Sequence, residues 1–150
     1  MTEVLKCDKW ENKTLVMMVG LPYSGKSTYA NELSVFYDAP IVCPDNIRIA
    51  LHGHKFIQEA EPMVWSIAKL MVKALFLSGH DYVILDATNL TKFRRSEWYS
   101  KNWKIEYRYI DTSHDECIRR ACVNNDDIMV NVIIKMAQNV EIPEVNEGNN

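Results

Sequence analysis

The sequence predicts an α/β domain of three layers, with helices on both faces of a mostly parallel sheet of four to five strands. Short apolar runs alternate along the chain with longer segments in which apolar residues recur at helical spacing. Such alternation is typical of right-handed crossovers in a parallel sheet. The 150 residues, 47% hydrophobic and 25% charged, match an ordinary soluble domain. One domain is therefore expected over residues 1–140, followed by a flexible tail over residues 141–150.

The net charge of −3 narrows the classes of function. A protein that coats nucleic acid regardless of sequence needs a strongly basic domain, whereas a local basic groove is compatible with this charge. No apolar run approaches the roughly 18 residues of a membrane-spanning helix, so no membrane partner is expected. Residues 1–13 lack a signal-peptide core, and the four cysteines form no C-x-x-C pair. These features favour a cytoplasmic protein with reduced thiols.

The first half of the chain is expected to hold two strands and two helices. Thr14–Val19 is an apolar run that ends at a glycine, which is typical of a strand covered on both faces. A helix should follow from Lys26, and Pro40–Cys43 should form a second strand. The inward residues of that helix are expected to be Tyr29, Leu33 and Phe36. The longest helix should run from Pro62 to Gly79. Its buried stripe is expected to be Met63, Ile67, Leu70, Met71 and Leu75.

The second half is expected to add two strands and three helices. Tyr82–Leu85 reads as a buried strand, and a helix is expected over Thr91–Lys101. Trp103–Ile110 alternates apolar and charged residues, which predicts a strand near the sheet edge. Residues 113–116 form a capping box that should open a helix to about Val123. After a polar break at residues 124–127, the last helix should face inward with Val132, Ile133 and Met136.

A phosphate-binding motif lies between the first predicted strand and the first predicted helix. Residues 20–27 read G-L-P-Y-S-G-K-S, a complete G-x-x-x-x-G-K-[ST]. Its glycines let successive backbone N–H groups converge on phosphate oxygens, and the helix N-terminus adds partial positive charge. Lys26 would supply charge to the β- and γ-phosphates, and Ser27 a hydroxyl to Mg²⁺. The expected nucleotide-binding residues are Gly20, Tyr23, Ser24, Gly25, Lys26, Ser27 and Thr28.

This motif predicts a nucleoside triphosphate site without specifying the fate of the γ-phosphate. A GTPase should carry an N-K-x-D sequence, which this chain lacks, and a large ATPase motor should be longer. A small kinase fits the length. The expected cofactors are ATP and Mg²⁺, with other nucleoside triphosphates left open.

Two charged residues follow the second predicted strand. Asp45 lies at the carboxyl end of that strand, where ligands bind in parallel sheets, and could accept the proton of an acceptor hydroxyl. Arg48, one helical turn later, could hold an acceptor phosphate. The alternative interpretation is a helix cap at Asp45 and a solvated Arg48.

The third predicted strand leads into V-I-L-D-A-T-N. Asp86 follows apolar residues in a Walker-B arrangement, which would place a carboxylate beside Mg²⁺, directly or through water. Thr88 and Asn89 suit contacts to phosphate or acceptor. The alternative is that Asp86 merely caps a helix or closes a turn. Of Arg94 and Arg95, one is expected toward the crevice and one in solvent.

Arg119 and Arg120 lie near the end of the capped helix, before the polar break. They could belong to a lid that supplies charge to the transferring phosphate. They could equally complement the dipole at a helix C-terminus. The four histidines have no partners at metal-ligand spacing and are expected on the surface: His52, His54, His80 and His114.

The sequence resembles the kinase domain of bacteriophage polynucleotide kinase and its small P-loop kinase relatives. The resemblance lies in three motifs in this order: G-L-P-Y-S-G-K-S-T, then P-D-N-I-R, then L-D-A-T-N-L followed by R-R-S-E-W. The resemblance covers about residues 14–140. It implies transfer of the ATP γ-phosphate to a 5′-hydroxyl of DNA or RNA. By its pattern Asp45 would be the general base and Arg48 the contact to the acceptor phosphate, with Thr88 and Asn89 on the acceptor side.

Two departures from the family pattern stand out. Ala87 lies directly before T-N, so the acid Asp86 comes one place earlier than in the phage enzyme. The lid reads R-R-A-C-V-N-N, with Val123 or Asn124 where a second arginine is usual. The alternatives are therefore a kinase of a small metabolite and a non-catalytic nucleotide-binding protein. The acceptor and the oligomeric state stay open.

Overall fold

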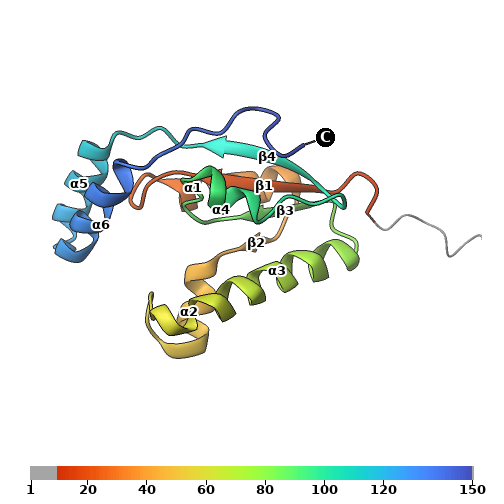
Figure 1. Ribbon diagram of the computed structural model, residues 1–150, viewed down its shortest axis with the longest axis horizontal. Helices are drawn as coiled ribbons and strands as arrows, with labels where there is room; N and C mark the ends of the chain where they lie inside the picture. Colours follow the sequence, from red (N-terminus) through yellow and green to blue (C-terminus); the bar gives the residue numbers. More distant parts are fainter. Residues whose placement is uncertain (1–9, 150) are drawn as a thin grey trace, which may run out of the picture.

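The computed structural model describes residues 10–149, so Cys7 and most of the N-terminal segment considered above lie outside the described residues. A parallel sheet of four strands runs through the molecule (Figure 1). The strands, in the spatial order β2-β3-β1-β4, are β1 (Thr14–Val19), β2 (Ile41–Val42), β3 (Tyr82–Leu85) and β4 (Lys104–Tyr109). The predicted α/β class and the expected number of strands are confirmed.

Helices follow the strands in alternation. They are α1 (Lys26–Tyr37), α2 (Pro44–His52), the 3₁₀ turn η2 (Gln58–Ala60), α3 (Glu61–Leu77), α4 (Lys92–Ser96), α5 (His114–Val123) and α6 (Asp127–Ala137). The predicted capping box is present, because the Ser113 side chain accepts from the Glu116 N–H at the start of α5. The helix expected over Thr91–Lys101 is shorter than predicted and ends at Ser96.

Strand β1 is buried on both faces, and its alternating side chains define the layers. Leu15, Met17 and Val19 belong to the cluster that contains the inner residues of α3. Val16 and Met18 belong to a second cluster, with residues of α1. Because successive side chains of a strand point to opposite faces, α3 and α1 cover opposite sides of the sheet. The three-layer prediction is confirmed.

The predicted buried stripe of α3 is wrong for Met63, Leu70 and Met71, whereas Ile67 and Leu75 are partly buried against the core. The fully buried residues are Val64, Ala68, Val72 and Phe76, whereas Met63 and Leu70 are 61% and 66% exposed. The helix is apolar on two faces, so periodicity alone does not select the inner one. In α1 likewise, Leu33 is buried as expected but Phe36 is 79% exposed.

Strand β4 lies at the sheet edge, as predicted, and the C-terminal segment packs beside it. The Asn149 side chain accepts from the Ile105 N–H at 2.8 Å and donates to the Ile105 carbonyl at 2.7 Å. Glu147 forms an ion pair with the buried Arg95. Residues 141–149 are therefore docked, contrary to the expectation of a flexible tail, because their side chains and backbone bond partners that lie 40 residues away or more.

The carboxyl ends of the strands point toward α5 and α6, which pack against each other beyond the sheet (Figure 1). We call residues 114–137, which form these two helices, the lid. No helix in the described part of the chain is long and apolar enough to cross a membrane.

Candidate active site

The phosphate loop connects β1 to α1, as the motif predicts. Gly25 precedes α1 with a φ of +96°, a left-handed conformation that favours glycine. A Cβ on Gly20 would lie 3.0 Å from Ser24 Oγ and 3.2 Å from the Ile110 carbonyl oxygen, so the loop has no room for a side chain there. The Lys26 ammonium donates to the Leu21 carbonyl at 3.0 Å, which folds its side chain back over the loop. The loop geometry thus suits a phosphate ligand.

The Walker-B carboxylate meets the phosphate loop. Asp86, 8% exposed at the end of β3, accepts a hydrogen bond from Ser27 Oγ at 2.8 Å. A hydroxyl and a carboxylate oxygen are the hard donors that Mg²⁺ prefers, and Mg²⁺ commonly takes one or two protein groups plus phosphate and water. Among residues 10–149 no larger cluster of His, Cys, Asp or Glu could hold a metal. Ser27 and Asp86 therefore fit a nucleotide-bound Mg²⁺.

The two predicted carboxylates lie at the same end of the sheet as Lys26. Asp86 follows β3, Asp45 lies in the first turn of α2 directly after β2, and Lys26 begins α1 after β1. The strands are parallel, so their carboxyl ends lie at one edge of the sheet. Burial lowers the pKa of Lys26 below its usual value, and the charges of Asp86 and Asp45 oppose that shift.

Arg48 lies between two carboxylates. Its Nη1 donates to Asp45 Oδ1 at 2.7 Å, and its Nε and Nη2 donate to Glu61 at 2.9 and 2.7 Å. The Asp45 side chain remains 54% exposed, whereas those of Arg48 and Glu61 are 14% and 16% exposed. The pairing of Glu61 with Arg48 was not predicted from the sequence. Nothing in its local sequence distinguishes Glu61 from a solvated residue in the first turn of α3. The expected contact of Arg48 to an acceptor phosphate stays a prediction, since this guanidinium is already paired twice.

Arg48 and Arg94 both lie against the aromatic ring of Trp65. The two guanidinium carbons lie 5.8 and 5.0 Å from the centre of the Trp65 ring. The Arg94 side chain is 45% exposed, and its ion pair with Glu97 is long, at 3.8 Å. Trp65 was also missed by the sequence analysis, which placed the neighbouring positions of α3 in the core. Arg94 is thus the member of the Arg94–Arg95 pair nearer to the candidate site.

Arg95 is not in solvent, contrary to the expected division between crevice and solvent. It is 1% exposed and donates to Glu147 at 2.8 and 3.0 Å and to the Asn89 carbonyl at 2.9 Å. Asn89 is also 1% exposed and donates to the Met18 carbonyl, while the Thr88 carbonyl accepts from the Gly20 N–H. Asn89 is therefore closed off from the acceptor side, and this segment supports the phosphate loop from behind.

The lid places Arg120, and not Arg119, on the phosphate loop. Arg120 Nη1 donates to the Tyr23 carbonyl at 3.0 Å and lies 3.8 Å from where a Cβ on Gly25 would be. Arg119 is 63% exposed and forms both of its hydrogen bonds with Glu116. Hydrogen bonds from Arg119 and Arg120 lower the pKa of Glu116 to about 2. Asn124, at the position expected for a second lid arginine, ends α5 and is exposed.

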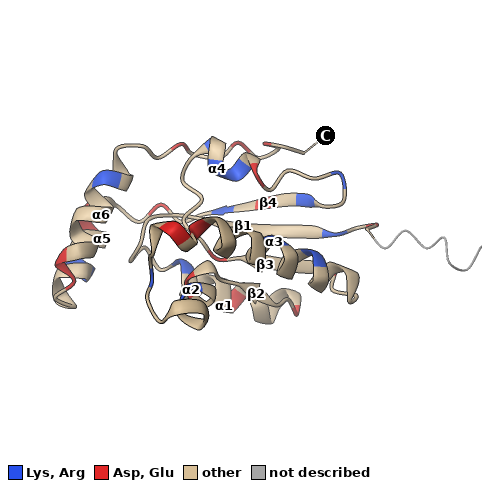
Figure 2. Cartoon of the chain, turned by 60° about the horizontal axis from the view of Figure 1, so that its bottom comes forward, with Lys and Arg blue, Asp and Glu red and all other residues tan. Residues whose placement is uncertain are grey.

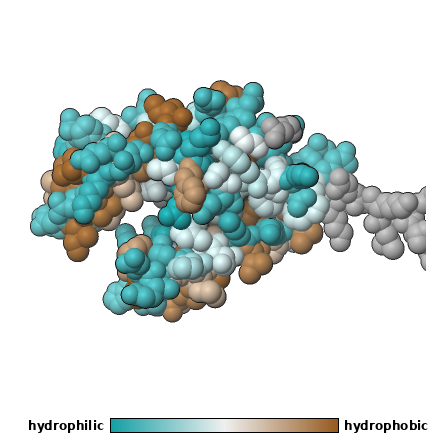
Figure 3. All heavy atoms as spheres, viewed as in Figure 1, coloured by the Kyte–Doolittle hydropathy of each residue, from teal (hydrophilic) through white to brown (hydrophobic). Residues whose placement is uncertain are grey.

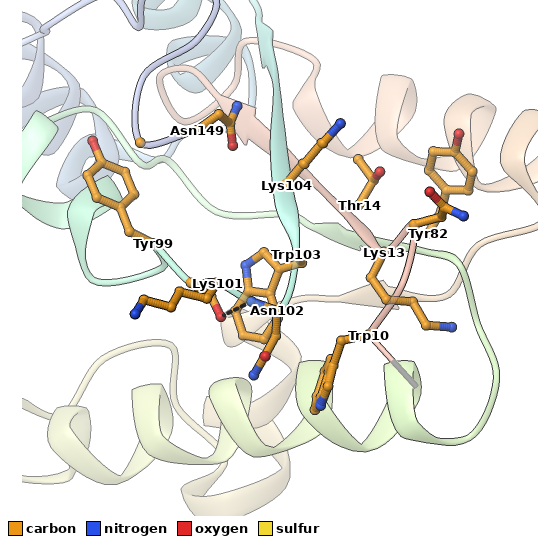
Figure 4. A pocket seen from close by; sticks show the side chains of 13 residues that line it. Trp10, Lys13, Thr14, Tyr82, Tyr99, Lys101, Asn102, Trp103, Lys104 and Asn149 are labelled. Carbon is orange, nitrogen blue, oxygen red and sulfur yellow. Dashed lines mark hydrogen bonds between the residues drawn. The ribbon is translucent and has the colours of Figure 1, made fainter. Parts of the chain in front are cut away.

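The candidate site is an open cleft. The surface is indented between the lid and α2 (Figure 3). A cavity of about 770 Å³ lies elsewhere, around the starts of β1 and β4 (Figure 4). Its lining includes Trp10, Lys13, Tyr82 and Lys104. Because the phosphate loop follows the other end of β1, this cavity is remote from Lys26 and is not the nucleotide site.

Solved structures share this fold. A chain of the Pnkp1/Rnl/Hen1 complex is 27% identical with a TM-score of 0.65, over 72% of this chain and 38% of that chain. A gluconokinase from Sinorhizobium meliloti 1021 is 16% identical with a TM-score of 0.57, over 88% and 76%. A putative kinase from Chloroflexus aurantiacus J-10-fl is 15% identical with a TM-score of 0.59, over 81% and 75%. The chain spans less than half the length of the Pnkp1/Rnl/Hen1 chains that it matches, 38% and 48%.

Residues 15–138 match the family AAA_33, described as an AAA domain. This match covers the phosphate loop, both carboxylates and the lid, and the structural neighbours are kinases or belong to a complex that contains Pnkp1. The chain therefore belongs to the AAA_33 family.

Proposed function

We propose that this chain transfers the γ-phosphate of ATP to a hydroxyl group, with a 5′-hydroxyl polynucleotide end or a nucleotide-like molecule as acceptor. One observation carries the proposal: the phosphate loop with Lys26, the hydrogen-bonded Ser27–Asp86 pair and the first turn of α2 with Asp45 all lie at the carboxyl end of the sheet. When bound, Mg²⁺ would supply positive charge that offsets the charge of the phosphates. Ser27 and Asp86 would hold it.

Each residue has a distinct role in this reaction. Asp45 accepts the proton as the acceptor O–H bond breaks, and the acceptor oxygen bonds to the γ-phosphorus as ADP leaves. Lys26 and Arg120 provide positive charge to the phosphates, where charge is largest in the transition state. Arg48 orients the Asp45 carboxylate through their 2.7 Å hydrogen bond. Its pairing with Glu61 leaves Arg94 as the more accessible cation beside the acceptor.

Three features support a polynucleotide end as the acceptor. The chain is 27% identical to a chain of the Pnkp1/Rnl/Hen1 complex, the most similar in sequence of the structures compared above. The cleft between the lid and α2 is open to the surface, as an end of a long molecule requires (Figure 3). Figure 2 shows charges of both signs spread over the chain. This distribution suits recognition of the end of a polynucleotide more than binding along its phosphate backbone.

A small metabolite is the second candidate acceptor. Arg48 is paired with two carboxylates, so it has fewer free N–H groups for an acceptor phosphate than the sequence predicts. The fold is also that of a gluconokinase. A non-catalytic nucleotide-binding protein is less well supported, because such a protein has no use for an oriented carboxylate at Asp45.

The test is transfer of labelled phosphate from ATP to a panel of acceptors: 5′-hydroxyl oligonucleotides, nucleosides, nucleotides and sugars. We expect label on the oligonucleotide 5′ end, and loss of labelling in Lys26→Ala with an unchanged circular dichroism spectrum. Label on a sugar alone would assign the second candidate. Transfer at the wild-type rate by Lys26→Ala would contradict the kinase assignment.

A further inference from the structure

Tyr23 joins the lid to the phosphate loop. Its hydroxyl donates to Asp126 Oδ2 at 2.7 Å, and its carbonyl accepts from Arg120 Nη1 at 3.0 Å. Arg120 lies in the last turn of α5 and Asp126 precedes α6, so a single residue of the loop holds both helices of the lid. The inner faces of both helices also pack in the main core cluster, through Cys117, Ala121 and Ile133, so the contacts of Tyr23 add polar attachments to an apolar one.

The backbone at Tyr23 is itself unusual. Its φ is +63°, in the left-handed region that favours glycine. A residue with a Cβ persists in this conformation only where the surrounding structure compensates for the strain. The two hydrogen bonds to the lid supply that compensation, because both depend on where this backbone conformation places the carbonyl and the ring.

Asp126 uses its two oxygens for different purposes. Oδ1 accepts from the Met129 N–H at 3.3 Å and caps the N-terminus of α6, while Oδ2 accepts from Tyr23. The carboxylate that begins α6 is thus also its attachment to the phosphate loop. Loss of the Tyr23 hydroxyl would leave the cap in place and release the attachment.

Arg120 is held in a way that leaves it able to bind a ligand. Its Nε donates to Glu116 and its Nη1 to the Tyr23 carbonyl. Its Nη2 makes no hydrogen bond within residues 10–149. Two of the three guanidinium nitrogens are therefore fixed beside the loop, and the third is free for a phosphate oxygen.

We propose that Tyr23 is a positioning residue, which holds the lid, and through it Arg120, over the phosphate loop before nucleotide binds. The role in phosphoryl transfer rests on the function proposed above. The attachment of the lid does not depend on it, so the two can be tested separately.

The attachment is tested by hydrogen exchange of the nucleotide-free chain. Tyr23→Phe keeps the ring and removes only the hydroxyl, so amides at the start of α6 should exchange about 10-fold faster, the scale of a lost hydrogen bond to a charged group. Tyr29→Phe is the matched control. Tyr29 lies on α1, and its hydroxyl has no hydrogen-bond partner in the described residues. Wild-type exchange at the start of α6 in Tyr23→Phe would overturn the proposal.

The positioning role is tested by a double-mutant cycle with Arg120→Ala. We expect Tyr23→Phe to lower kcat about 10-fold with the acceptor KM unchanged, and to cause no further loss once Arg120 is alanine. Equal losses in both backgrounds would show that Tyr23 acts independently of Arg120 and would overturn the role. If the wild-type chain transfers no phosphate at all, the proposed function fails, while hydrogen exchange still decides the attachment.

Discussion

Asp45 combines access to the cleft with a fixed orientation. Its side chain is 54% exposed, so an acceptor hydroxyl can reach it, and the Arg48 hydrogen bond at 2.7 Å limits its rotation. A mere helix cap would bond a backbone N–H of α2, but no side-chain cap is formed there. Asp45 is thus not the N-cap of α2, which is Cys43, and its role as general base stays a prediction.

Asp45→Asn is expected to lower the transfer rate by about 10²–10⁴-fold, because it keeps the shape of the carboxylate and removes its basicity. ATP affinity should be unchanged, since Asp45 is proposed to contact the acceptor. Steady-state kinetics and equilibrium ATP binding provide the measurement. A wild-type rate would show that Asp45 is structural.

Glu61→Gln provides the matched control for that variant. It removes the charge of the other Arg48 partner and leaves the proposed base intact. We expect a loss of no more than about 10-fold, in line with one weakened charge-assisted hydrogen bond. Losses of the same size in both variants would mean that the pairing of Arg48, and not the basicity of Asp45, limits the rate.

At the scale of elements, α5 separates two adjacent arginines. Arg119 and Arg120 both bond Glu116, at i+3 and i+4, but only Arg120 also reaches the phosphate loop. Consecutive residues of a helix point about 100° apart, so they cannot share one target across the cleft. Arg120 therefore has the contact expected of a lid residue, whereas Arg119 pairs only with Glu116.

Arg120→Ala should lower the transfer rate by roughly 10³-fold or more, the scale of arginine residues that stabilise a transferring phosphate. Arg119→Ala, which removes the same charge one position away, should change the rate by no more than about 2-fold, the effect of an exposed ion pair. Single-turnover transfer from labelled ATP measures both. Similar losses in the two variants would contradict the placement of α5.

At the scale of the whole molecule, the C-terminal segment connects distant parts of the fold. Glu147 is 6% exposed and pairs with Arg95, which also donates to the carbonyls of Asn89 and Glu141. Asn89 in turn bonds Met18, two residues before the phosphate loop. The docked segment thus stabilises the sheet edge and the rear of the candidate site together.

Glu147→Gln should lower the free energy of unfolding by about 3 kcal/mol, the low end for breaking a buried ion pair. Hydrogen bonds from Arg95 lower the pKa of Glu147, so its contribution is present above the usual pKa of glutamate and is lost as pH falls through the lowered value. The difference from wild type should therefore be largest near neutral pH and shrink in acid.

Denaturant unfolding at several pH values measures this difference. Glu144→Gln, in the same segment and exposed, is the control and should be neutral within about 0.5 kcal/mol. A neutral effect of Glu147→Gln at pH 7 would show that the C-terminal segment does not contribute to stability.

The sequence by itself determined the strand–helix alternation, the phosphate loop and the carboxylates that follow β2 and β3. These features are local: apolar runs, glycine spacing and a polar residue at the end of a strand carry them. The parallel topology then brings the carboxyl ends together, which is why Asp45, Asp86 and Lys26 could be predicted to lie at the same end of the sheet.

Only the tertiary structure decided which face of α3 is buried, which arginine of each pair reaches the site, and that residues 141–149 are docked. The tertiary structure also decided the partners of three further residues. Arg48 contacts Glu61, 13 residues away, and Trp65, 17 residues away. Tyr23 contacts Asp126, 103 residues away. Such contacts depend on the distance between packed elements and on side-chain direction. Local periodicity determines neither the distance nor the direction. A helix that is apolar on two faces can bury either face, and either of two adjacent arginines can point to the site, without any change in the sequence pattern.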